Sequence, residues 1–184
     1  MFRRINRQAN AAAALTPAQM NAIRQVNQLA ANGKFVEAAG ILTLLAQQME
    51  SSNHPRRAAN FHAQAAHLYA DGGDPVQSLV HARAALKLFI QYQMVNRTPR
   101  FYANITQKMR NRGMPVVAAQ LEKEFGTVVG SLPAQAQIPG QPAHGRLPSS
   151  CPQCGAPARS DEVEWIDNAS AECMFCGGVI QTIS

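Results

Sequence analysis

The sequence predicts a mainly α-helical protein, built from antiparallel helical hairpins and followed by a small C-terminal β module. Two observations predict the helices: glycines recur at a fixed spacing over the first two thirds of the chain, and apolar residues recur there at helical spacing. One observation predicts the module: all four cysteines lie at the C-terminal end, as two Cys-x-x-Cys pairs.

The helical segment is expected to form three helix–turn–helix units between residues 17 and 125. Each turn is marked by a glycine, which tolerates the left-handed conformation at the end of a helix. These evenly spaced glycines are Gly33, Gly73 and Gly113. Pro75 and Pro115 follow their glycines by two positions, where the start of a helix tolerates a missing N–H.

Two further positions share the period of the glycines. A small residue comes five positions after each glycine, and a larger apolar residue comes four positions before it. The small residues are Ala38, Ser78 and Ala118, and the larger ones are Leu29, Tyr69 and Met109. One hairpin alone cannot bury such a face, so neighbouring hairpins are expected to stack.

The middle unit resembles the tetratricopeptide-repeat family. The matching residues are Ala66, Tyr69, Gly73, Asp74, Pro75, Ser78, Leu79, Ala82, Ala85 and Leu86. The resemblance covers about residues 19–126 and implies a superhelix whose surface binds protein partners. The family's usual period of about 34 residues is shorter than the period of 40 found here, and the aromatic and leucine pair that opens its first helix is absent. An ordinary six-helix bundle is therefore the alternative fold.

Four segments are expected along the chain. Residues 1–16 form a basic N-terminal segment, and residues 17–127 form the helical-repeat domain. Residues 128–150 form a linker, because glycine and proline recur there among alanine, glutamine and serine. Residues 151–184 form the cysteine module.

The four cysteines have the spacing of a tetrahedral thiolate metal site. Eighteen residues separate Cys151 and Cys154 from Cys173 and Cys176, and a glycine follows the second cysteine of each pair. Thiolates in this geometry suit Zn²⁺. The two turns resemble the knuckles of the zinc-ribbon family over residues 151–184. Four cysteines close the coordination shell, so one structural zinc ion without a catalytic water is expected.

Two alternatives to zinc are open. The cysteines could be two reactive dithiols without a metal, or they could hold iron, because rubredoxins use similar four-cysteine knuckles. Rubredoxin cores are rich in aromatic residues, however, and only Trp165 and Phe175 are available here. A strand is expected around Val163–Ile166 and a second one over Val179–Ile183.

Charge is unevenly distributed along the chain. Residues 1–130 contain 15 Lys and Arg against 6 Asp and Glu, a net charge of +9, whereas residues 151–184 have a net charge of −4. A basic stretch with two aromatic residues lies between Arg97 and Arg112 and could bind nucleic acid. The other interpretation is a solvated helix face whose aromatic residues, Phe101 and Tyr102, point to the core.

The sequence shows no catalytic constellation. It contains no phosphate-binding loop and no Ser/His/Asp arrangement. The five histidines, which lack metal-ligand spacing, are expected to be solvated or to pack between helices. They are His54, His62, His67, His81 and His144.

The expected function is that of a cytoplasmic, non-enzymatic adaptor. It would bind protein partners through the helical surface and through the tethered zinc module. No apolar run is long enough to cross a membrane. A nucleic-acid-associated zinc-ribbon protein is one alternative, and an accessory, ligase-type adaptor subunit of an enzyme complex is another.

Overall fold

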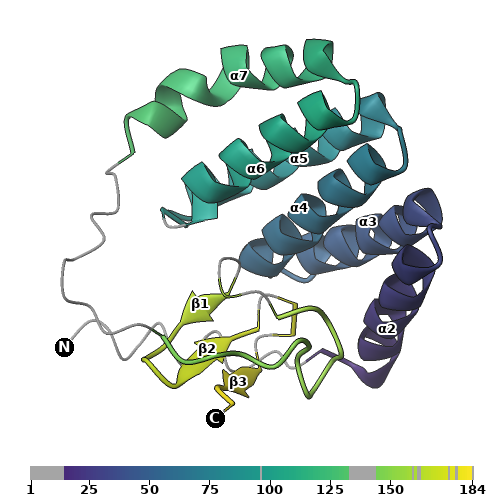
Figure 1. Cartoon of the computed structure of the whole chain (residues 1–184), viewed down its shortest axis with the longest axis vertical. Helices are drawn as coiled ribbons and strands as arrows, with labels where there is room; N and C mark the ends of the chain where they lie inside the picture. The colour runs from purple at the N-terminus through teal and green to yellow at the C-terminus, as the bar shows by residue number, and fades with distance from the viewer. Residues whose placement is uncertain are drawn as a thin grey trace. The chain divides into compact units, whose positions relative to one another are not determined.

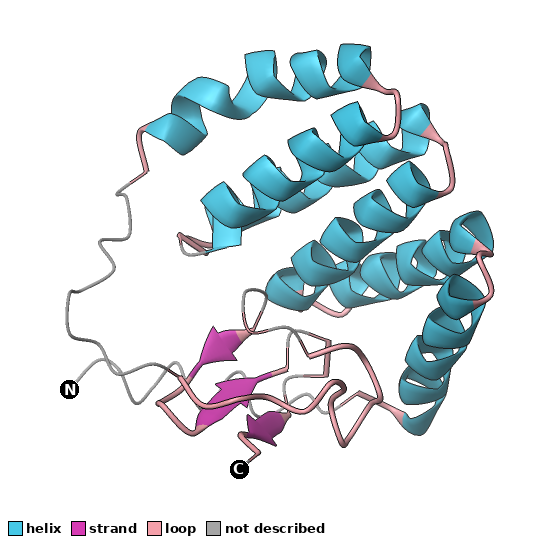
Figure 2. Cartoon of the chain, in the orientation of Figure 1, coloured by secondary structure: helices cyan, strands magenta, loops and turns pink. Residues whose placement is uncertain are grey.

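The computed structural model describes residues 15–95, 97–132, 144–158, 160, 163–173, 175–176 and 178–183. Within this part of the chain, six helices are followed by three short strands, which confirms the mainly α-helical fold class (Figures 1 and 2). The helices are α2 (Pro17–Ala31), α3 (Phe35–Ser51), α4 (Pro55–Asp71), α5 (Pro75–Gln91), α6 (Arg97–Asn111) and α7 (Pro115–Gly130).

Contacts divide the chain into two compact units. One spans Val26–Gln137 and contains α3 to α7, and the other combines Met1–Gln25 with Ile138–Ser184. In the first unit each helix from α3 to α7 packs on the next one, and α4 also contacts α6 while α5 contacts α7. The core between α4 and α7 includes several fully buried large side chains, among them Leu86, Ile105, Met109 and Leu121.

The same turn closes five helices in succession, at an even spacing along the chain. In each turn one residue has a left-handed backbone, and the next N–H donates to the carbonyl five positions earlier at 2.8–2.9 Å. This hydrogen-bond pattern is the Schellman motif. The left-handed residues are Gly33, Asn53, Gly73, Gln93 and Gly113. The structural unit is therefore one helix and one turn, and each interval between glycines spans two units.

A small side chain early in each of α3 to α7 recurs at the same spacing as the turns. All five are at most 1% exposed: Ala38, Ala58, Ser78, Thr98 and Ala118. The two hydroxyl groups among them are satisfied, because Ser78 donates to the carbonyl of Ala66 at 2.9 Å and Thr98 to that of Met94 at 3.0 Å. Small side chains at this position let neighbouring helices approach closely.

We expect Gln93→Gly to stabilise the helical unit by up to about 1 kcal/mol, since a left-handed backbone strains every residue with a Cβ. Gly73→Ala should destabilise it by about the same amount. No atom lies within 4 Å of a Cβ at Gly73, so only backbone strain is added. Unfolding in guanidinium, followed by helical circular dichroism, measures both changes. Lys87→Gly, in the exposed interior of α5, is the control and should lose about 1 kcal/mol.

The cysteine module contains a three-stranded antiparallel sheet in the order β1-β2-β3. The strands are β1 (Glu164–Trp165), β2 (Ser170–Glu172) and β3 (Val179–Gln181). In the register of the sheet, Trp165 of β1 is paired with Ala171 of β2, and Ala171 is paired with Ile180 of β3. The first and last strands fall within the predicted ones. The central strand was not predicted.

The segment just before the first cysteine pairs with the module. Gly145 donates to the carbonyl of Asn168 at 2.9 Å, and Ile183 donates to that of Arg146 at 2.7 Å. Of the predicted linker, residues 128–130 form the end of α7 and residues 133–143 lie outside the described part of the chain.

Candidate metal centre

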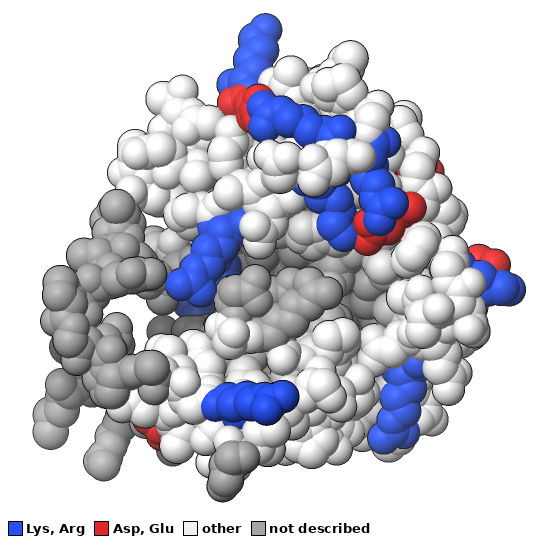
Figure 3. Space-filling model, viewed as in Figure 1, with Lys and Arg blue, Asp and Glu red and all other residues white. Residues whose placement is uncertain are grey.

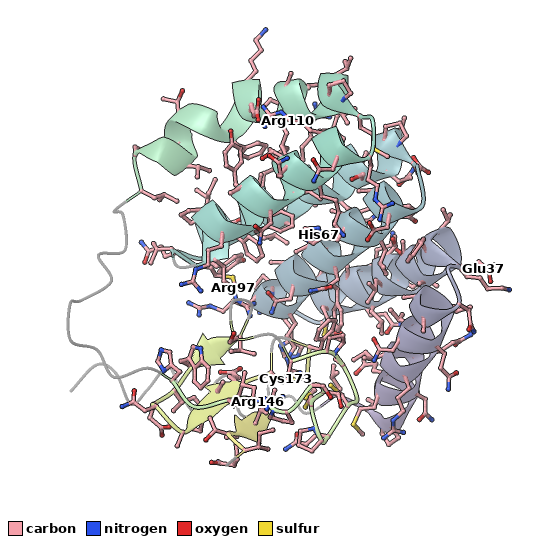
Figure 4. The ribbon with its side chains drawn as sticks, viewed as in Figure 1. Glu37, His67, Arg97, Arg110, Arg146 and Cys173 are labelled. Atoms are coloured by element: carbon pink, nitrogen blue, oxygen red, sulfur yellow. The ribbon has the colours of Figure 1, made fainter. Side chains whose placement is uncertain are left out.

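The four cysteines meet in one buried cluster. Their sulfur atoms all lie within 4.8 Å of one another (Figure 4 labels Cys173). Two of the sulfur–sulfur distances, Cys151 to Cys176 and Cys154 to Cys173, are 3.7 Å. A tetrahedral ion with metal–sulfur bonds of about 2.3 Å requires sulfur atoms about 3.8 Å apart. The cluster therefore has the dimensions of a four-thiolate metal site.

Both knuckles are closed by the same backbone hydrogen bond. The N–H of Cys151 donates to the carbonyl of Ala156 at 2.7 Å, and the N–H of Cys173 donates to that of Gly178 at 2.8 Å. Each bond joins residues five positions apart and turns both cysteines of a pair toward one point. Gly155 has a φ of 75°, as expected for a glycine that follows a knuckle.

The module that contains the four sulfur atoms also buries apolar side chains. Ala156, Ala171 and Ile180 are fully buried, and Phe175 is 4% exposed. The N–H of Gly178 lies 3.4 Å from the sulfur of Cys176, where it can stabilise a thiolate. This environment excludes water and leaves the four sulfurs as the only metal-ligating side-chain atoms of the cluster among the described residues.

Mutual hydrogen bonding makes the four thiols unequal in acidity. Hydrogen bonds from Cys154, Cys173 and Cys176 hold the pKa of Cys151 far below its usual value. The interaction with Cys151 and burial raise the pKa of Cys154 and of Cys173. Cys151 raises the pKa of Cys176, but Cys154 and Cys173 bring it down to about 7. A bound cation must therefore displace protons from the cluster.

The histidines have packing roles of their own. His62 and His81 are buried between helices, and His67 contacts the ring of Phe101 edge-on, with ring centroids 5.4 Å apart. His144 stacks on Trp165, with ring centroids 4.1 Å apart. For His62, His67 and His81 the interpretation as histidines that pack between helices agrees with the structure.

The basic stretch of α6 is largely partnered within the helical unit. Lys108 and Arg112 both contact Asp71 of α4, at 2.6 and 2.8 Å, and Arg110 contacts Glu122 of α7. Acidic atoms lie beside basic ones on the face in Figure 3. Phe101 is buried, as the helix-packing interpretation requires. These cations tie helices together, which reduces the positive surface available to nucleic acid.

Comparison of the chain with protein-family models, curated proteins and solved structures finds no match. None of the helices in the described residues is long and apolar enough to cross a membrane. The function is therefore argued from two features, the helical unit and the cysteine cluster.

Proposed function

We propose that the cysteine cluster binds one structural zinc ion through Cys151, Cys154, Cys173 and Cys176. The support is the sulfur spacing and the burial of all four thiols. Four thiolates suit zinc and leave no coordination position for a substrate or water. Iron can occupy the same geometry. Zinc is preferred because the module contains only Trp165 and Phe175 as aromatic residues.

We propose further that the protein is a non-enzymatic adaptor in which the helical unit binds a protein partner and the zinc module offers a second contact. One observation carries this proposal. Val36, Val76 and Val116 occupy the second position of α3, α5 and α7 and are 46%, 65% and 79% exposed. Exposed apolar residues repeated along a stack of helices favour a protein interaction surface.

Nucleic-acid binding is the second candidate, because residues 1–130 have a net charge of +9. Two observations weigh against it. Basic residues of α6 form ion pairs with Asp71 and Glu122, and the cysteine module has a net charge of −4, which phosphates would repel.

A titration with single-stranded and duplex nucleic acid near 150 mM salt separates the two functions. The adaptor is expected to bind only in the non-specific range, with a Kd of about 10⁻⁴ to 10⁻⁶ M. Deleting residues 151–184 should leave this affinity unchanged or slightly stronger, because an acidic module is removed. Helical circular dichroism checks that the deletion variant is folded. Sub-micromolar binding that is lost on deletion would refute the adaptor.

The partner surface has its own matched test. In a pull-down, the triple variant Val36→Asp, Val76→Asp and Val116→Asp should lose a partner that the wild type captures. A control variant with aspartate at Gln77, Gln91 and Gln120 places the same number of negative charges on other exposed helix positions and should keep that partner.

A further inference from the structure

Two histidines meet inside the helical unit. His62 of α4 is 6% exposed and His81 of α5 is 4% exposed. Their Nδ1 atoms lie 2.8 Å apart, and their ring centroids are 5.0 Å apart. At this distance the two nitrogens must share one hydrogen, so one ring donates and the other accepts.

The pair is the centre of a chain of four contacts. On one side, Nε2 of His62 lies 3.1 Å from a carboxylate oxygen of Glu50 in α3. On the other side, Nε2 of His81 lies 3.1 Å from the hydroxyl of Thr43, also in α3. The Thr43 hydroxyl in turn donates to the carbonyl of Ala39 at 3.0 Å. This hydrogen-bonded series thus begins at Glu50 in α3, passes through His62 in α4 and His81 in α5, and returns to α3 at Thr43.

Counting hydrogens shows that this hydrogen-bonded series can form all four of its contacts only with an added proton. Both ends, the Glu50 carboxylate and the Ala39 carbonyl, can only accept. Four contacts require four hydrogens. Two neutral histidines and one threonine hydroxyl supply three, so the fourth hydrogen must come from an imidazolium.

We propose that His62 and His81 act together as a one-proton switch. Uptake of a single proton completes all four hydrogen bonds and fastens α3 to α4 and α5. Loss of that proton opens one of the four contacts and weakens the attachment of α3.

The negative charge nearest to the pair is on the His62 side, where a carboxylate oxygen of Glu50 lies 3.1 Å from Nε2 of His62. Burial, followed by the nearby positive charge of His62, lowers the pKa of His81 to about 4 against a weaker opposing effect of Glu50. His81 therefore stays neutral in the range in which the pair switches.

The other groups near the pair leave the hydrogen count unchanged. Tyr69 of α4 stacks on His81 with ring centroids 5.3 Å apart, and its hydroxyl lies 3.5 Å from that of Thr43. The Tyr69 hydroxyl has a hydrogen of its own for this additional contact, so the count of four contacts and three hydrogens does not change. From α6, Arg97 bonds Asn60 and Lys108 bonds Asp71, so neither cation takes part in the chain.

Thr43→Val provides the test, because valine has the shape of threonine without its hydroxyl. Two contacts then remain, from Glu50 to His62 and from His62 to His81, and two neutral histidines supply both hydrogens. We expect the midpoint of proton uptake by the pair to fall by about half to one pH unit. The midpoint is read from the ¹⁵N chemical shifts of the histidine rings of the full-length protein between pH 5 and 8.

Thr43→Ser is the matched control, since it keeps the hydroxyl and should keep the midpoint of the wild type. Glu50→Gln, at an exposed position, gives a second reading if Thr43→Val is poorly folded, and it should also lower the midpoint. A Thr43→Val midpoint equal to that of the wild type overturns the proposal. So does uptake of two protons by the wild-type pair above pH 5.

Discussion

Cys173→Ser is expected to abolish metal binding and to unfold the cysteine module, while α3 to α7 remain helical. In the proposed zinc site the metal would contribute most of the folding free energy of so small a module, because zinc binding to four-ligand sites of this kind is worth about 10–16 kcal/mol at neutral pH. Removing one of four ligands also leaves three buried cysteines without the cation that would balance the negative charge of their thiolates. The helices should persist, because contacts divide the chain into two units with Cys173 in one and α3 to α7 in the other.

Elemental analysis and spectroscopy together measure this effect. The wild type should contain about one zinc and little iron per chain, and the variant should contain almost none. Helical circular dichroism should change little. The fluorescence of Trp165 should shift toward that of an exposed indole, since this ring stacks on His144 and donates to the carbonyl of Ser160 at 3.1 Å.

Ser149→Ala is the control, because Ser149 is an exposed serine two residues before Cys151, and this variant should keep its zinc. Metal-free wild-type protein, purified without a chelator and still folded in the module, would favour reactive dithiols instead of a metal site. A cooperative loss of helix in Cys173→Ser would show that the two parts fold together.

The helical hairpins and their period of 40 residues were visible in the sequence, but the shorter repeat of one helix and one turn within them was not. Glycine occupies only alternate turns, so the glycines indicate a period twice as long as the structural unit. Asn53 and Gln93 take the same left-handed conformation in the turns between them, with φ of 59° and 52°. Asparagine is an accepted substitute for glycine there, whereas glutamine gives no signal. The shorter unit of one helix and one turn became clear only from the backbone.

The cysteine cluster could be predicted because ligand spacing within a tight knuckle is a local property. The central strand could not. Ser170, Ala171 and Glu172 have no strand-forming composition, and these residues are held in a strand because β1 and β3 pair with them on both sides. Pairing with the two neighbouring strands, and not the local sequence, therefore makes these residues a strand.

The histidine pair gave no sequence signal for a related reason. His62 and His81 are separated in the chain by close to one helix-and-turn unit, so they lie on neighbouring helices. Whether two such positions face each other depends on how α4 and α5 pack, and periodicity alone does not define that. The partners Glu50 and Thr43 come from a third helix, which adds a further packing dependence.

Acid is expected to destabilise the helical unit through His81. In the folded chain burial and the charge of His62 lower the pKa of His81 to about 4, against an ordinary value of 6.5. Between these pH values the unfolded chain binds a proton at His81 that the folded chain does not bind. The contribution of His81 to the free energy of unfolding therefore falls as the pH drops from 6.5 to 4, by at most about 1.4 kcal/mol per pH unit and about 3 kcal/mol in total.

Guanidinium unfolding, followed by helical circular dichroism at pH 7.5, 6.5 and 5, measures this loss. The hydrogen bond from Arg83 lowers the pKa of Glu124, so this carboxylate stays charged between pH 6.5 and 5 and its protonation adds little. In His81→Gln, whatever its absolute stability, the loss over this interval should be smaller than in the wild type by about 2 kcal/mol. Equal slopes for wild type and His81→Gln would show that His81 is protonated as easily in the folded chain as in the unfolded one.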